Sequence, residues 1–360
     1  MSSYAWNCGI NWLTRDAFFN SYFGGLGCYH VVVHAPEHYE ACDSLGDAYV
    51  EAQRMTACRR DCTSPLDYWN SDNGFKQVVT AALALPKGDV CTWAMREAVY
   101  SKVKECTNFK PSLAKHIINF FGAKKVLDFR AGWGERMLGA LAAEVEEYLA
   151  FDPNLTLQAG HSLALRTHGT PLQQQNFTIR YEPFESSDLS SEDFSADLVF
   201  TSPPFFNLEV YTTPEHARGQ SIQSHKGVSA WLVKFLFQAL KKAWSCLSRG
   251  GHMALHYSDT TKERTVRRRS PGSNKTSICI AFIHAAQVEA MLLYCVGWLQ
   301  HCAYIGVMGS LGDSGTPRPV WCLRKLDVGD AIPADHAFKA RAAMGNHFPE
   351  VKRMMDEVKL

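Results

Sequence analysis

The chain contains 360 residues, of which 46% are hydrophobic and 20% are charged, and its 37 basic and 36 acidic residues leave a net charge of +1. This ordinary globular composition excludes disorder, a collagen and a coiled coil for most of its length. Near-zero net charge also excludes binding of a polyanion through bulk charge, so a nucleic-acid contact would need a local basic patch. Because one compact core rarely serves so long a chain, we expect either a main domain with a sizeable appendage or two domains.

Targeting and membrane signals are absent from the sequence. The first 14 residues lack the basic start and continuous apolar run of a signal peptide. The most apolar stretch, residues 278–308, contains histidine, glutamine and glutamate and is too polar to span a bilayer. We therefore expect a soluble intracellular protein without a membrane contact, in either the nucleus or the cytoplasm. The oligomeric state stays open.

Twelve cysteines are spread over the chain, and without a secretory signal free thiols are the default. A set of possible zinc ligands recurs at four-residue steps and is followed by two more cysteines: His30, His34, His38, Cys42, Cys58 and Cys62. Residues 31–33 are valines, which favour a strand, and Pro36 would break a helix. Because no paired CxxC occurs either, we expect no metal site.

Residues 1–110 lack strand–helix alternation, and weak helical periodicity in two stretches predicts a mainly helical N-terminal extension of unknown role. The predicted strands beyond it span residues 124–128, 147–151, 177–181, 196–201, 252–256, 302–307 and 320–325. The predicted helices span residues 111–121, 135–144, 155–167, 230–247 and 285–298. This alternation over residues 111–326 predicts a doubly wound, mostly parallel α/β sheet covered on both faces. Residues 327–360 read as a polar tail with one amphipathic helix at 350–358.

A glycine-containing turn follows the first predicted strand of the sheet and reads Asp128-Phe-Arg-Ala-Gly-Trp-Gly134. Gly132 and Gly134 would let the backbone approach a ligand closely at the carboxyl edge of the sheet. Asp128, at the strand end, could bind a cationic or hydroxylated group of that ligand. The simpler interpretation is a strand–helix turn that merely needs glycine.

Asp152 ends the second predicted strand, in Phe151-Asp-Pro-Asn154. In nucleotide-binding doubly wound sheets, an acidic residue about twenty positions beyond the glycine turn accepts hydrogen bonds from ribose hydroxyls. The alternative is a helix cap, for which Asp and Asn are both suited. A dinucleotide fingerprint would need glycine at position 137, where this chain has methionine, so nicotinamide and flavin are disfavoured.

The strongest motif is Ser202-Pro-Pro-Phe205, at the end of the hydrophobic strand 196–201. Two consecutive prolines remove donors and stiffen the loop that presents the Ser202 hydroxyl and the Pro203 carbonyl. These oxygens could accept hydrogen bonds from an exocyclic amino group while Phe205 stacks on a planar ring. A buried proline turn with a core phenylalanine is the alternative.

Residues 124–326 resemble the class I S-adenosylmethionine-dependent methyltransferases, whose sheet is a seven-stranded Rossmann-like one. Within these, the chain is similar to the amino-methyltransferases that modify cytosine or adenine in nucleic acid, whose Ser/Asp/Asn-Pro-Pro-aromatic signature is matched by Ser202, Pro203, Pro204 and Phe205. The Thr-Ser-Pro-Pro-Phe form is most similar to the cytosine branch. The resemblance implies S-adenosylmethionine as cofactor, bound by Asp128, Arg130, Ala131, Gly132, Trp133, Gly134, Asp152 at the ribose and Glu185 near the adenine.

Two residues depart from the family pattern: Arg130 stands where many members have Gly or Phe, and Trp133 where Ser or Gly is frequent. Arg130 has three candidate partners, namely the methionine carboxylate, a substrate phosphate and Asp128. No target-recognition domain is recognisable in the sequence.

The resemblance implies methyl transfer to an exocyclic amino group of a nucleobase, first of all cytosine N4 in DNA. The alternatives are an adenine or guanine amino group of RNA, a free small amine, and a non-catalytic methyltransferase-like subunit. Candidate substrate-binding residues are Phe206 and a basic loop whose role could equally be that of a solvated loop: Lys262, Arg264, Arg267, Arg268, Arg269 and Lys275. His256, Tyr257 and Asp259 could line the pocket, although core packing explains His256 equally well.

Overall fold

The computed structural model describes most of the chain beyond residue 44. The described residues are 44–85, 91–103, 105–106, 108–206, 208–211, 213, 219–258, 287–308, 319–331 and 335–360, with the backbone alone for 29–33, 265–267, 278–280 and 309–310. None of the helices in these ranges combines the length and the apolar composition that crossing a bilayer requires.

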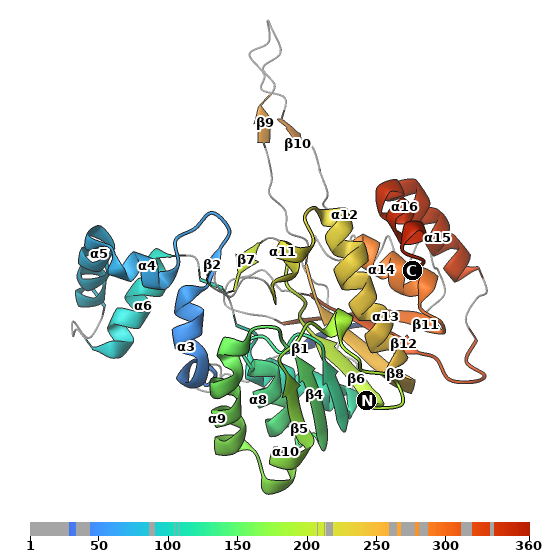
Figure 1. Cartoon of the computed structure of the whole chain (residues 1–360), viewed down its shortest axis with the longest axis horizontal. Coiled ribbons are helices and arrows are strands. Elements are labelled where there is room, and N and C mark those ends of the chain that lie inside the picture. The colour runs from blue at the N-terminus through green and yellow to red at the C-terminus, as the bar shows by residue number, and fades with distance from the viewer. Residues whose placement is uncertain are drawn as a thin grey trace, which may run out of the picture.

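An eight-stranded sheet forms the centre of the molecule, in the order β1-β11-β12-β8-β6-β3-β4-β5 (Figure 1). Its strands are β1 (Tyr29–Val33), β3 (Lys125–Asp128), β4 (Glu147–Phe151), β5 (Phe177–Arg180), β6 (Ala196–Thr201), β8 (Leu247–His256), β11 (Cys302–Ser310) and β12 (Pro319–Lys325). All pairings are parallel except the two made by β12. The seven strands predicted beyond residue 124 are all present, which confirms the doubly wound Rossmann-like fold, and β1 adds an eighth beside β11.

The strand order reverses between β3 and β6. From β3 the sheet continues through β4 and β5 to one side, and from β6 through β8 to the other. Ligands of doubly wound sheets bind in the crevice outside the carboxyl ends of the strands at such a reversal. Asp128 ends β3 and Thr201 ends β6, so the glycine turn and the Ser-Pro-Pro-Phe loop both begin at this crevice.

Two hydrophobic cores lie against the sheet, and alternate residues of one strand contribute to different cores. Val126 packs in one and its neighbour Leu127 in the other, as expected for a strand buried on both faces. The covering helices are α7 (Pro111–Phe121), α8 (Glu135–Ala142), α9 (Gln158–His168), α10 (Pro171–Asn176), α11 (Ser221–Ser224), α12 (Val228–Trp231), α13 (Phe237–Ser245) and α14 (Gln287–Trp298). Pro111 occupies the start of α7, and Gly122 ends it with φ 62°.

The helix predicted over 230–247 differs in two respects. It contains a π-helical turn at Leu232–Leu236, and it ends at Ser245 because β8 begins at Leu247 rather than at residue 252. Gly250 and Gly251 lie inside β8, next to a shift in the β6–β8 register. A Cβ on Gly251 would lie 2.9 Å from the carbonyl oxygen of Asp197, so the close approach of two strands requires glycine there.

The C-terminal segment contains two helices where one was predicted, α15 (His336–His347) and α16 (Pro349–Glu357). Both add side chains to the core beside α14, so this segment is packed where a polar tail was expected. The buried residues of α15 include Ala340, Ala343 and Met344. Because alanine carries little hydrophobic signal, the sequence gives α15 no clear apolar stripe.

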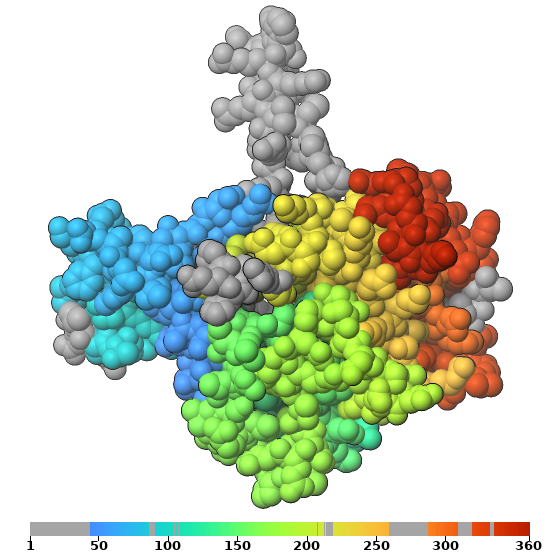
Figure 2. Space-filling view, viewed as in Figure 1, coloured from blue at the N-terminus to red at the C-terminus, as the bar shows by residue number. Residues whose placement is uncertain are grey.

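The N-terminal region contributes α3 (Asp47–Thr56), β2 (Cys58–Arg59), α4 (Pro65–Asn70), α5 (Asp72–Leu83) and α6 (Thr92–Lys102). Helices α4 to α6 surround a small core of their own and form a lobe beside the sheet domain, blue to cyan in Figure 2. The strand β2 pairs with β7 (Glu209–Val210), which follows the Ser-Pro-Pro-Phe loop. The N-terminal region therefore reaches the crevice directly.

Candidate active site

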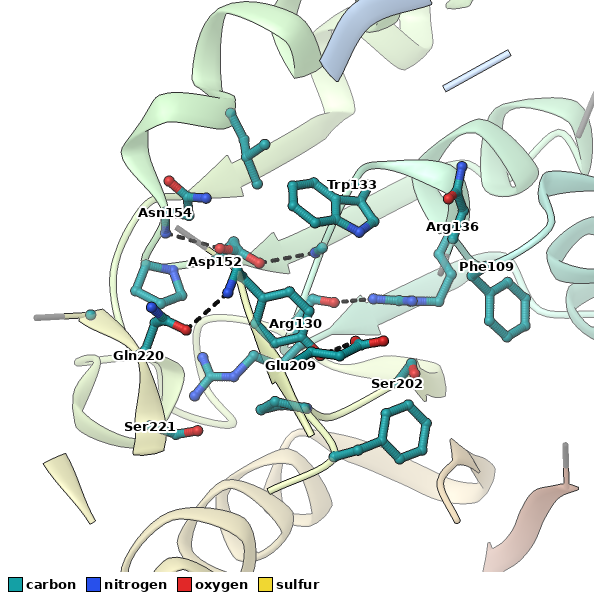
Figure 3. A pocket seen from close by; sticks show the side chains of 18 of the residues that line it. Phe109, Arg130, Trp133, Arg136, Asp152, Asn154, Ser202, Glu209, Gln220 and Ser221 are labelled. Carbon is teal, nitrogen blue, oxygen red and sulfur yellow. Dashed lines mark hydrogen bonds between the residues drawn. The ribbon is translucent and has the colours of Figure 1, made fainter. Parts of the chain in front are cut away.

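A cavity opens at the carboxyl ends of β3, β4 and β6, where the strand order reverses (Figure 3). Gly132, Trp133 and Asp152 line one wall, which we call the turn wall. The opposite wall includes Ser202 and Phe205, and we call it the proline-loop wall. The two motifs singled out in the sequence thus face one shared space, although 70 positions separate Gly132 from Ser202.

Asp152 is held by the backbone of both neighbouring turns. The N–H of Gly132 donates to Oδ2 and the N–H of Asn154 donates to Oδ1, each at 2.9 Å. Burial raises the pKa of the Asp152 carboxyl. Each carboxylate oxygen has a second lone pair, so Asp152 can still accept hydrogen bonds from ligand hydroxyls in the cavity.

His161 supports the turn from behind. Burial lowers its pKa to about 4, so the imidazole is neutral at physiological pH. Nε2 lies 3.1 Å from the carbonyl oxygen of Gly132, and Nδ1 lies 3.0 Å from the hydroxyl of Tyr181. Since a carbonyl only accepts, Nε2 carries the proton and Nδ1 accepts from Tyr181. Gly134 has φ 94°, and a Cβ there would lie 2.9 Å from the His161 ring, which explains this glycine.

Asp128 lies behind the turn and is fully buried. Its carboxylate accepts hydrogen bonds from Arg136 Nε at 2.8 Å, from the Tyr148 hydroxyl at 2.9 Å and from the backbone N–H of Arg130 at 3.1 Å. Ala131, also buried, donates its N–H to the carbonyl of Phe151 at 2.8 Å. Asp128 and Ala131 therefore shape the turn, and the cavity is lined by their neighbours.

Arg130 lines the cavity and pairs with Glu185, the residue expected near the cofactor adenine. Its Nη2 lies 2.9 Å from Glu185 Oε2, and its guanidinium carbon lies 4.5 Å from the centre of the Phe235 ring. Of the three candidate partners, Asp128 receives only the backbone N–H of Arg130. The side chain instead pairs with Glu185 and lies over Phe235, in the π-helical turn Leu232–Leu236.

Three buried side chains of the cavity carry polar atoms without a hydrogen-bond partner among the described residues: Nη1 of Arg130, Oε1 of Glu135 and Nε2 of Gln220. Burial raises the pKa of Glu135 to about 7. Leaving a buried polar atom unpaired costs about 1–3 kcal/mol, so such atoms call for an explanation and a ligand is one. A cation, a carboxyl group and an amide together suit a ligand with both donors and acceptors.

On the proline-loop wall, the Ser202 hydroxyl contacts His256, with 2.9 Å between Oγ and Nδ1. Phe205 is only 7% exposed, and its ring stacks on Tyr257 with 5.7 Å between centres. Pro204 and Phe206 also line the cavity, and Phe206 adopts a positive φ of 39°. Pro203 is buried beside them.

Sequence reasoning missed the part of the cavity formed by Glu209, Tyr211 and Gln220. The Tyr211 hydroxyl donates to Glu209 Oε2 at 2.8 Å, and the Tyr211 N–H donates to Gln220 Oε1 at 3.0 Å. Burial raises the pKa of Tyr211 well above its ordinary value, so the phenol stays a donor. These residues carry no motif, and Glu209 belongs to β7, whose partner strand β2 is distant in the sequence.

Asn108, Phe109, Glu135 and Arg136 also line the cavity and were missed. The one usable signal was the position of Glu135 and Arg136 directly after the glycine turn. Of the proposed basic loop, Arg267 lies in β9 (Thr265–Arg267), whose backbone pairs with β10 (Ile278–Ile280). The other basic residues of that loop, Arg268 and Arg269 among them, lie outside the described residues, as does Asp259.

The chain matches no protein-family model and no curated protein. It is similar in structure to TrmN from Thermus thermophilus, with 14% identity over 74% of this chain and 82% of that one, at a TM-score of 0.39. An rRNA methylase from Streptococcus thermophilus is 14% identical over 62% of this chain and all of the other, at a TM-score of 0.36. A SAM-dependent O-methyltransferase from Thermotoga maritima is 12% identical over 64% and 71%, also at 0.36. The fold itself is established by the strand order.

Proposed function

We propose that the chain is an S-adenosylmethionine-dependent methyltransferase that modifies an exocyclic amino group of a nucleobase. The observation that carries the proposal is the shared cavity, with Gly132 and Asp152 on the turn wall and Ser202 and Phe205 on the proline-loop wall. A methyl donor and a methyl acceptor must meet within one enclosed space, and this cavity supplies chemistry suited to each.

The turn wall fits the cofactor. Gly132 lines the cavity and has φ 58°, a conformation that side chains rarely adopt, so the turn presents bare backbone to a ligand. Asp152 suits ribose hydroxyls, and the unpartnered atoms of Arg130, Glu135 and Gln220 suit a ligand with carboxylate, ammonium and base nitrogens. When bound, S-adenosylmethionine would supply an electrophilic methyl group on sulfur.

The proline-loop wall fits a planar amine. The Ser202 hydroxyl and the Pro203 carbonyl would accept hydrogen bonds from the amino hydrogens and turn the nitrogen lone pair toward the methyl group. The aromatic rings that line the cavity suit a flat base. Most of the acceleration would come from positioning, which is worth about 7–11 kcal/mol for well-oriented reactants.

We propose cytosine N4 in DNA as the first acceptor to test, because the Thr201-Ser-Pro-Pro-Phe205 sequence is most similar to the cytosine branch. An adenine or guanine amino group in RNA is the alternative. A base within a duplex would have to be extruded before transfer. Nucleoside mass spectrometry after incubation with labelled cofactor and mixed DNA and RNA distinguishes these acceptors.

Variants of the two walls test the proposal. Ser202→Ala and Phe205→Ala should each lower turnover about 100-fold while cofactor binding persists, because both residues belong to the wall proposed for the acceptor. Asp152→Ala should weaken cofactor binding at least about tenfold, since it removes a charged hydrogen-bond acceptor. Isothermal titration calorimetry measures binding, and methyl incorporation measures turnover.

Ser245→Ala, on the exposed side of α13, and Phe338→Ala, 74% exposed, are the matched controls and should leave both quantities unchanged. Unchanged turnover in Ser202→Ala and Phe205→Ala would exclude this cavity as the site of methyl transfer. A chain that binds no cofactor at all would be the non-catalytic subunit instead.

A further inference from the structure

The Ser202–His256 contact lies at the centre of the proline-loop wall, and nothing in the Ser-Pro-Pro-Phe motif calls for a histidine. We propose that His256 is a positioning residue that acts through the Ser202 hydroxyl: its Nδ1 holds that hydroxyl as an acceptor for the substrate amino group and then receives the proton. This inference rests on the proposed function and assigns a second residue to the acceptor side of the same site.

The sheet itself sets the two side chains level with each other. The strands β6 and β8 run parallel, with Thr201 opposite Leu255. One position further along, Ser202 follows the end of β6 and His256 is the last residue of β8, so the two stand at the same height at the carboxyl edge of the sheet. Oγ of Ser202 then lies 2.9 Å from Nδ1 of His256 and 3.3 Å from its backbone oxygen.

Aromatic neighbours hold the imidazole ring. The Phe109 ring meets it edge to face with 4.9 Å between centres, and the Phe205 ring does so at 5.9 Å. His256 is 7% exposed, and it lines the cavity together with Ser202 and both of these rings. A ring fixed on two sides keeps Nδ1 directed at the hydroxyl, which a merely space-filling core histidine would not require.

In the tautomer that this role requires, the imidazole proton lies on Nε2, so that Nδ1 accepts the Ser202 hydroxyl proton in the shorter of the two contacts. Oγ then keeps two lone pairs, of which one can accept a hydrogen of the substrate amino group. When bound, S-adenosylmethionine would supply the methyl group to this nitrogen and its sulfur would keep the electron pair of the carbon–sulfur bond, which would leave the nitrogen cationic. The nitrogen gives its proton to Oγ, Oγ gives its own to Nδ1, and the imidazolium later returns one proton to solvent.

Two substitutions of His256 separate this role from packing. His256→Phe keeps a ring between Phe109 and Phe205 but removes Nδ1. His256→Asn places an amide oxygen near the position of Nδ1, so it restores a hydrogen-bond acceptor that takes up no proton. His252→Phe is the matched control, because His252 lies on the same strand, away from the cavity, and packs on Phe121.

Single-turnover methyl transfer, cofactor affinity by calorimetry and the thermal midpoint are measured for each variant. His256→Phe should slow transfer about 100-fold, within the usual range for a proton acceptor, with affinity and midpoint unchanged. His256→Asn should recover about tenfold of that loss. The double variant Ser202→Ala/His256→Phe should be no slower than Ser202→Ala alone, because both substitutions interrupt one chain of contacts.

Three results would overturn the inference while the proposed function stands. The first is a methyl-transfer rate of His256→Phe within about twofold of an active wild type. The second is a transfer rate of His256→Asn no higher than that of His256→Phe. The third is a loss of rate in the double variant equal to the product of the two single losses. His256→Asn at the full wild-type rate would overturn the proton-accepting step. A wild-type chain that methylates no nucleobase would overturn the proposed function, and the role of His256 with it.

Discussion

The two walls of the cavity are built in different ways. On the side of the turn wall, every hydrogen-bond partner of the Asp128 and Asp152 carboxylates lies within 20 positions in the chain. On the proline-loop wall, Ser202 contacts His256, 54 positions away, and β7 pairs with β2, some 150 positions earlier. The turn wall is built from a strand, a turn and a helix that follow one another in the chain. The proline-loop wall forms only when segments distant in the sequence have come together.

Because one wall is built from nearby residues and the other from distant ones, we expect substitutions in the two walls to change different properties. The turn wall encloses buried charges within its own short segment, so changes there should act first on stability and cofactor affinity. The proline-loop wall joins remote segments through single hydrogen bonds, so changes there should act first on how the acceptor is held. Substitutions in the two walls can therefore be ranked by their expected effect on the free energy of unfolding.

The largest effect is expected at Asp128. Asp128→Asn keeps the shape of the side chain but leaves the buried Arg136 guanidinium without its counter-charge. Removing one partner of a buried ion pair typically costs about 3–5 kcal/mol. Urea unfolding should show this loss, and the folded fraction should still bind cofactor, because Asp128 faces away from the cavity.

Glu147→Gln is the control for Asp128→Asn, because Glu147 pairs with Lys125 on the surface of neighbouring strands. An exposed pair of this kind contributes about 0–1 kcal/mol. Equal losses of unfolding free energy in Asp128→Asn and Glu147→Gln would show that the buried pair of Asp128 contributes no more than an exposed one. The assignment of Asp128 to the structure of the turn and of Asp152 to the cofactor would then fail.

An intermediate and pH-dependent effect is expected at Glu135, next to Arg136 on the same helix. Its pKa is raised from 4.5 to about 7 by burial, so the folded protein holds this proton more tightly than the unfolded chain does. Stability should therefore fall as pH rises from about 4.5 to 7. The Glu135→Gln variant cannot lose a proton at this position. Its free energy of unfolding relative to that of wild type should therefore rise by about 3 kcal/mol between these two pH values. Urea unfolding at several pH values measures the difference, and parallel curves would contradict it.

Much of the fold and of the turn wall could be predicted because their signals are local. Glycines 132 and 134 and Asp152 stand at fixed distances from hydrophobic strands, and the structure brings them to one cavity edge. Ser202 was predicted for the same reason, since the two prolines mark a strand end. That Asp128 faces inward could not be seen, because its partner Tyr148 belongs to the next strand.

The rest of the cavity depends on contacts that no local pattern encodes. Glu209, Tyr211 and Gln220 follow the proline loop without periodicity or spacing typical of a site, and Glu209 lies in β7, which pairs with the distant β2. The pairing of Arg130 with Glu185 likewise joins two turns 55 positions apart. For α15 the limit is composition, because a helix packed through alanine has no hydrophobic stripe to recognise.

The smallest effect is expected on the proline-loop wall, at Tyr211. Tyr211→Phe removes the hydroxyl that donates to Glu209 Oε2 at 2.8 Å and leaves the ring beside Trp133 in place. A hydrogen bond to a charged partner such as Glu209 contributes about 1.5–3 kcal/mol, so we expect a loss of about 2 kcal/mol by urea unfolding. Tyr68→Phe is the control, because its hydroxyl bonds to Gln77 on the surface, where water replaces the lost partner. Tyr211→Phe could instead match this control both in its free energy of unfolding and in its KM for the acceptor. The Tyr211–Glu209 contact would then contribute neither to stability nor to how the cavity holds the acceptor.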